Sequence, residues 1–169
     1  MKLLSVILLC ALTLGSLSAQ ELTLDACRHA LKNALRLNHR DSLASAYCHL
    51  GEYYAYRNSD SARYYFEKGL SHVRRSDVPL YCTLLINTAE TYFAKGDLDE
   101  AVRCFRFAYR EVERLQAAVE YQVTALSSLG VIYRRQAMPD SALVCYTQAL
   151  QALEPVDLPD EEMFLLTNI

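Results

Sequence analysis

Small and aromatic residues recur at fixed positions along the chain between residues 50 and 150. In three stretches a small residue is followed by an aromatic residue three positions later. A short polar break comes next, then an alanine, an aromatic residue four positions on, and another small residue three positions after that. The recurring columns are Gly51, Ala89, Gly130; Tyr54, Tyr92, Tyr133; Ala62, Ala101, Ala142; Phe66, Phe105, Tyr146; and Gly69, Ala108, Ala149. Offsets of three, four and seven place these residues on one face of a helix.

The pattern has a long and nearly constant period. The column alanines Ala62, Ala101 and Ala142 lie 39 and then 41 residues apart. Self-similarity at such a period is typical of arrays of helix–turn–helix units, which cannot bury their apolar stripes alone. The chain contains only 5 glycines and 4 prolines in 169 residues, which also favours an all-helical fold. We expect Pro139 in the first turn of a helix, and a capping box between Asp97 and Glu100.

These columns resemble the tetratricopeptide repeat family. The resemblance rests on Leu-Gly followed by Tyr at 50–54 and 129–133, on the sequence GDLDEA at 96–101, and on the alanine–aromatic–small triplets. The middle unit departs from the pattern with Thr88-Ala89, and the period of about 40 rather than 34 resembles a long-period variant. The resemblance covers residues 45–155 and implies an all-α fold, a right-handed superhelical solenoid of antiparallel helix hairpins.

The same register divides the chain into units. We expect a repeat domain over 20–169, with units at about 45–75, 80–117 and 121–155 and partial units at 22–40 and 160–169. The sequence EEMFLLTNI matches YCTLLINTA, with Asn168 over Asn87, so the chain is expected to stop inside the first helix of a fourth unit. We interpret it as a fragment of a longer protein, with self-association expected through an uncapped C-terminal end.

The first nineteen residues have the three-part layout of a secretory signal peptide. Lys2 supplies the positive start, Leu3 to Leu14 is largely apolar, and small residues lead to a cleavage position after Ala19. The apolar run is short for a membrane span. An uncleaved anchor, a lipid anchor through Cys10 and a buried helix are the alternatives. The layout predicts an exported protein of the periplasm or cell envelope.

Composition and motifs indicate no chemistry. The net charge is −3 and no basic stripe appears, which argues against nucleic-acid binding. The cysteines beyond the first twenty residues are five in number and widely spaced, either as buried free thiols or with one long-range disulfide. No metal-ligand or nucleotide-binding motif is present, so we expect no cofactor, no metal and no enzymatic activity. An enzyme that depends on Cys48 or His49 is the remote alternative.

The family resemblance implies a function in binding a protein or peptide on the concave face, built from the first helix of each hairpin. In the family register the face residues are Glu52, Tyr56, Ile86, Glu90, Phe93, Ser127, Arg134 and Arg135. A signal sequence ahead of long-period repeats resembles the extracytoplasmic sensor or scaffold part of bacterial regulators. A free-standing exported adaptor or envelope-assembly scaffold is the alternative. Contact with a membrane is expected only through a downstream segment that this sequence lacks.

Overall fold

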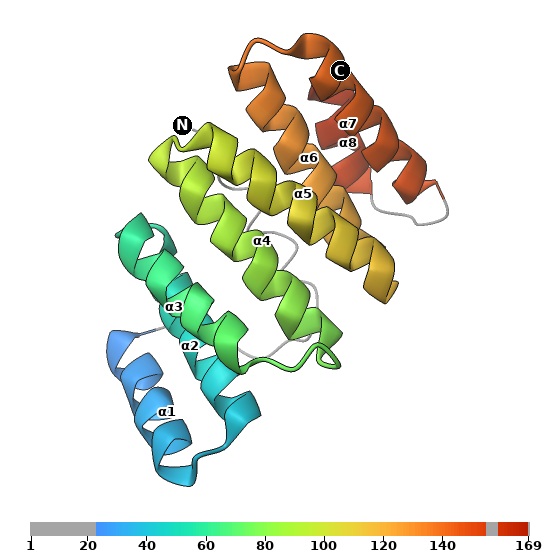
Figure 1. Ribbon diagram of the computed structural model, residues 1–169. Coiled ribbons are helices and arrows are strands. Elements are labelled where there is room, and N and C mark those ends of the chain that lie inside the picture. Colours follow the sequence, from blue (N-terminus) through green and yellow to red (C-terminus); the bar gives the residue numbers. More distant parts are fainter. Residues whose placement is uncertain (1–22, 155–158, 169) are drawn as a thin grey trace.

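The structure is a computed structural model that describes residues 23–154 and 159–168 (Figure 1). The signal peptide predicted at residues 1–19, including Cys10, lies outside these residues. The described residues form eight helices and no strand. The helices are α1 (Leu24–Leu37), α2 (Arg40–Ala55), α3 (Ser59–His72), α4 (Val78–Lys95), α5 (Leu98–Leu115), α6 (Val119–Arg135), α7 (Pro139–Leu153) and α8 (Pro159–Asn168).

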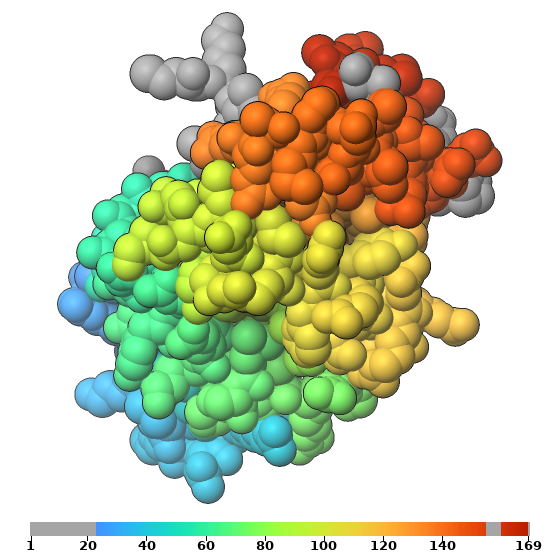
Figure 2. All heavy atoms as spheres, turned by 45° about the horizontal axis from the view of Figure 1, so that its top comes forward, coloured from blue at the N-terminus to red at the C-terminus, as the bar shows by residue number. Residues whose placement is uncertain are grey.

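Each helix packs mainly against the helices that precede and follow it in the chain. The helices therefore form a row, from α1 at one end to α7 and α8 at the other (Figure 1). Figure 2 shows the same order on the molecular surface, where segments that are neighbours in the chain lie next to one another. This arrangement confirms the predicted all-α solenoid of helix hairpins. The assignment of individual hairpins to repeat units remains our prediction.

Close contacts between small and aromatic residues of the recurring columns hold the hairpins together. A Cβ atom built on Gly51 in α2 would lie 2.3 Å from Cε1 of Phe66 in α3. The same atom on Gly130 in α6 would lie 2.5 Å from Cε1 of Tyr146 in α7. Both distances are far below van der Waals contact, so only glycine lets the two helices of each hairpin approach this closely.

The other repeated columns form the centre of the hydrophobic core. Ala62 and Ala101 are fully buried, Ala142 is 4% exposed, and Phe105 is fully buried on the next turn of α5. Leu84 and Ile132, from the first helices of two hairpins, belong to the same cluster. One contiguous core therefore runs from α2 to α8, and the burial of its apolar surface is the main source of stability.

Helix ends follow the sequence signals with one exception. Pro139 is the first residue of α7, as predicted. Gly96 ends α4 in the left-handed conformation, with φ of 88°, which glycine adopts without strain. The predicted capping box is wrong: the Asp97 side chain makes no capping hydrogen bond, and Glu100 pairs with Arg103 along the exposed face of α5. Arg103 lies three residues after Glu100 on the same face of α5 and competes for the carboxylate that a capping box requires.

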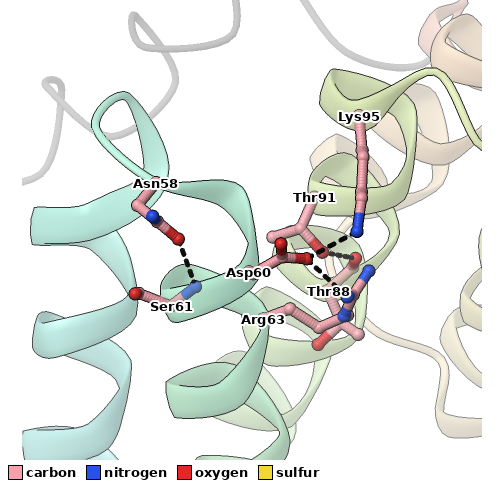
Figure 3. A network of polar contacts seen from close by, with 7 residues as sticks. All are labelled: Asn58, Asp60, Ser61, Arg63, Thr88, Thr91 and Lys95. Carbon is pink, nitrogen blue, oxygen red and sulfur yellow. Dashed lines mark hydrogen bonds and ion pairs between the residues drawn. The ribbon is translucent and has the colours of Figure 1, made fainter.

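A polar network joins the first two hairpins at the surface (Figure 3). Oδ1 of Asp60, at the start of α3, accepts hydrogen bonds from Nη2 of Arg63 at 2.7 Å and from Nζ of Lys95, near the end of α4, at 2.8 Å. The hydrogen bond from Lys95, its charge and the Arg63 guanidinium lower the pKa of Asp60. Asn58 caps α3 by accepting the Ser61 N–H at 2.8 Å. The network fixes the register between the hairpins more than it adds stability, because exposed ion pairs contribute little.

The five cysteines within the described residues are free thiols. Cys104 is partly buried, and the other four, Cys27, Cys48, Cys82 and Cys145, are buried. Burial raises the pKa of each of the five thiols, so thiolate, the reactive form, is disfavoured. Across residues 23–154 and 159–168, the helices are too short or too polar to cross a bilayer.

Candidate partner-binding face

The first helices of the hairpins form a row of their own. Besides their contacts within the hairpins, α2 packs against α4 and α4 packs against α6. These contacts bring the solvent-facing side chains of α2, α4 and α6 into one strip, which we call the inner face. Except for Ile86, the predicted face residues on these helices are at least partly exposed. The inner face therefore gathers polar and aromatic side chains from three hairpins.

Glu90 lies at the centre of the inner face, between α4 and α6. Its Oε1 accepts a hydrogen bond of 3.0 Å from the Ser128 hydroxyl on α6. Burial of the carboxyl raises the pKa of Glu90 to about 7, although the Ser128 hydrogen bond favours the charged form. Near neutral pH this carboxyl is therefore divided between its charged and its neutral form. It is the inner-face group whose charge responds most directly to small changes in physiological pH.

Glu52 occupies the equivalent position on α2. The Cys48 thiol donates a hydrogen bond of 3.6 Å to its Oε1. Burial raises the pKa of Glu52, while the charge of His49 and the Cys48 hydrogen bond oppose the rise. Glu52 and Glu90 thus form the acidic part of the inner face, and both are partly desolvated. A partly desolvated carboxylate favours a partner that supplies positive charge or a hydrogen-bond donor.

Aromatic and basic side chains complete the strip. Tyr56, next to the end of α2, is 61% exposed. Partial burial and the charge of Glu90 raise the pKa of Tyr56. On the α6 side, the Arg135 guanidinium carbon lies 4.4 Å from the centre of the Phe93 ring. This cation–π pair is worth about 0.5–1 kcal/mol at an exposed site and holds both side chains over the inner face.

The remaining predicted residues have other surroundings. Nη1 of Arg134 donates a hydrogen bond of 2.7 Å to Oδ1 of Asn168 on α8. The Ser127 hydroxyl donates to the Thr124 carbonyl of its own helix at 3.1 Å. Ile86 is 5% exposed and packs in the core, so it offers almost no surface to a partner. The structure thus brings Tyr56, Glu90, Phe93 and Arg135 together and leaves Ile86 out.

Ser128 was missed by the sequence reasoning, which chose Ser127. The family register places Ser128 in the same column as Asn87 and Asn168, two residues before the small position of the first helix. The polar character of that column was the signal that could have identified it. Its hydroxyl reaches the neighbouring hairpin, whereas Ser127 bonds within α6.

The Cys48 thiol next to Glu52 is held in its less reactive form. Burial and the charge of Glu52 raise the pKa of that thiol far above neutrality, which disfavours the nucleophilic thiolate. Within the described parts of the chain, no cluster of three or more His, Cys, Asp or Glu side chains could hold a metal ion. The inner face offers mixed charge and aromatic surface, which are common in protein-binding sites.

Comparison with known proteins agrees with this class of helical-repeat solenoid. The N-terminal domain of stress-induced protein-1 (STI-1) from C. elegans superposes with a TM-score of 0.62, at 19% sequence identity, over 78% of this chain and 98% of that domain. At this identity the likeness shows the fold alone. No curated protein sequence matches the chain.

The family itself is identified over the second half of the array. Residues 80–154, which span nearly all of α4 and the whole of α5, α6 and α7, match the family model described as "Tetratricopeptide repeat". Over these residues the chain matches the tetratricopeptide repeat family, as its columns of small and aromatic residues predicted. Repeats of this family generally mediate protein–protein interaction and are typically not enzymes.

Proposed function

We propose that the chain is a non-catalytic module that binds an extended protein segment on its inner face. The observation that carries the proposal is the continuous strip from Tyr56 through Glu90 to Phe93 and Arg135, which draws on three hairpins. Aromatic and arginine side chains are the residues that most often dominate the energy of protein interfaces. A strip that crosses successive helices suits an extended peptide.

The charges of the strip define the kind of segment. The α2 and α4 side carries Glu52 and Glu90, and the α6 side carries Arg134 and Arg135. A complementary segment has a basic residue toward α2, an apolar residue over Phe93, and an acidic residue toward α6. Since Glu90 is half neutral near pH 7, the basic residue is favoured more strongly as the pH rises.

Selection of peptides from a phage-displayed library on the full chain tests the proposal. We expect the selected peptides to share this charge order and to lose at least about tenfold in affinity when Arg135→Glu reverses one end, because a paired charge becomes a repulsion. Arg110→Glu, at an exposed position of α5, is the matched control and should leave the affinity unchanged. Peptides that bind Arg135→Glu and the unaltered chain equally would show that the inner face is not the site.

We also propose that the protein is exported and forms the extracytoplasmic sensor or scaffold part of a bacterial regulatory protein. The support is the signal-like layout of residues 1–19 ahead of the repeats. N-terminal sequencing of the chain recovered from the cell envelope should then give a sequence that starts near Gln20. Recovery of a chain that still begins at Met1 would contradict cleavage after Ala19.

A further inference from the structure

A pocket with a volume of about 600 Å³ opens between the first two hairpins, away from the inner face. Arg40 at the start of α2, Arg74 and Arg75 from the α3–α4 connection, Tyr81 from α4 and Phe107 from α5 contribute to its lining. Tyr81 and Glu90 are nine residues apart on α4, about two and a half helical turns, so they face opposite sides of that helix. We call this site the arginine pocket.

The arginine pocket is positively charged because its lining contains three arginines and no acidic side chain. Nε of Arg40 donates to the His72 carbonyl oxygen at the C-terminus of α3, at 2.6 Å. The Arg75 guanidinium carbon lies 5.8 Å from the centre of the Tyr81 ring. Both of these contacts are with neutral groups, whereas Arg74 forms an ion pair with Asp41 at 3.4 Å. The charge of Arg75 also helps to lower the pKa of the Glu111 carboxyl behind the pocket.

The aromatic wall of the pocket is fixed from behind. The Tyr81 hydroxyl donates a hydrogen bond of 3.1 Å to Oε2 of the buried Glu111. Arg114 holds the same carboxylate with two bonds, of 2.9 and 3.0 Å. Those bonds, with the Tyr81 bond, lower the pKa of Glu111, which stays charged and engaged at neutral pH. Glu111 therefore orients the Tyr81 ring and is already paired when an anion reaches the arginines.

The mouth of the pocket offers exposed apolar surface. Phe107 is 43% exposed, and Leu85 from α4, which is 8% exposed, lies in the floor. An exposed aromatic side chain beside three guanidinium groups suits a ligand with an anionic head and a flat apolar body. A volume of 600 Å³ is within the range of small-molecule sites.

We propose that the arginine pocket binds a small-molecule oxyanion, a phosphate or a carboxylate carried on an aromatic body. The guanidinium forks of Arg40 and Arg75 hold the oxyanion, and the body packs between Phe107 and the Tyr81 ring. The site is separate from the inner face, so the chain can hold this ligand and a protein segment at the same time. The pocket is lined by residues of the α2–α3 and the α4–α5 hairpins, so the bound ligand also stabilises the contact between these hairpins.

Titration calorimetry of the full chain tests the proposal with four compounds. Phenyl phosphate and phenylacetate carry both ligand features, and the tighter of the two identifies the preferred oxyanion. Benzyl alcohol keeps the ring without the charge, and inorganic phosphate keeps the charge without the ring. We expect each of these two to bind at least about tenfold more weakly than phenyl phosphate, because each loses one of two cooperating contacts. Equal binding of benzyl alcohol and phenyl phosphate would overturn the proposal.

Two variants locate the site. Arg75→Gln, in the exposed α3–α4 connection, should weaken phenyl phosphate by about tenfold or more, since a charge-assisted hydrogen bond is lost. Phe107→Ser should weaken phenyl phosphate and leave inorganic phosphate unchanged. Arg57→Gln removes an equal charge from the α2–α3 connection, at the opposite end of α2 from Arg40, and should have no effect on either compound. The proposal fails if Arg57→Gln weakens binding as much as Arg75→Gln, or if phenyl phosphate gives no saturable heat.

Discussion

Replacement of Gly130 by alanine is expected to lower the free energy of unfolding by about 2–3 kcal/mol, the cost of overpacking a core. In an ordinary helix the same change stabilises by about 1 kcal/mol, so the predicted sign is reversed. The new Cβ would lie 2.5, 2.7 and 2.8 Å from three ring atoms of Tyr146. Tyr146 is 1% exposed and cannot rotate away without moving its own neighbours. Urea denaturation of the two proteins measures the difference.

A second substitution can show that the loss of stability comes from the clash between the new methyl group and the Tyr146 ring. Tyr146→Leu shortens the side chain that the new methyl group would strike. The double variant Gly130→Ala with Tyr146→Leu should therefore lose less than the sum of the two single losses. Gly51→Ala, against Phe66, should repeat the effect in the first hairpin. A Gly130→Ala protein more stable than the original would mean that α6 and α7 are farther apart than described.

Replacement of Glu90 by glutamine should stabilise the protein by about 3 kcal/mol at pH 8 and have little effect near pH 4. Burial raises the pKa of Glu90 to about 7 in the folded chain, above the ordinary value of 4.5. The folded state therefore binds the proton more tightly than the unfolded state. The favourable contribution of the neutral carboxyl is complete below the unfolded pKa and is lost as the pH rises through the folded one. Glutamine does not titrate and can still accept the Ser128 hydrogen bond.

Denaturant unfolding at a series of pH values measures this gap between the variant and the original protein. Glu67→Gln, at an exposed position of α3, removes the same formal charge and is the control for net-charge effects. The gap for Glu90→Gln should open between about pH 4.5 and pH 7 and then level off. A constant gap across this range, or an equal one for Glu67→Gln, would show that Glu90 is hydrated like a surface carboxylate.

The fold was predictable because its determinants recur at helical spacing. The alanine column and the aromatic column of Phe66, Phe105 and Tyr146 mark positions where a change of size cannot be absorbed, and all of them are buried in the structure. In the other aromatic column Tyr133 is buried, whereas Tyr54 and Tyr92 are partly buried. Local helix propensity predicts only separate helices, whereas recurrence at a fixed period predicts that these helices stack into a solenoid. The failed capping box at Asp97 and Glu100 shows the limit, since the choice between competing partners within one turn depends on side-chain geometry.

The binding face was predictable only in part. The alignment of the repeats was enough to assign residues to the inner side of α2, α4 and α6. How deeply each of these residues is buried depends on how closely neighbouring hairpins approach. That approach covers Ile86 and sets Glu90 against Ser128 rather than against open solvent. The arginine pocket had no signature at all, because Arg40 and Arg74 are 34 residues apart and meet only through the antiparallel return of α3.

The neighbour-to-neighbour packing of the helices has a kinetic consequence. Because most contacts join helices adjacent in the chain, the loops that close during folding are short and their closure entropy is small. Chains dominated by such local contacts fold quickly, and repeat arrays can nucleate at more than one place. A hairpin such as α4–α5 can bring its two helices together early, but it needs a neighbouring hairpin to bury its apolar stripe. Its exposed side then serves as the template on which the next hairpin condenses.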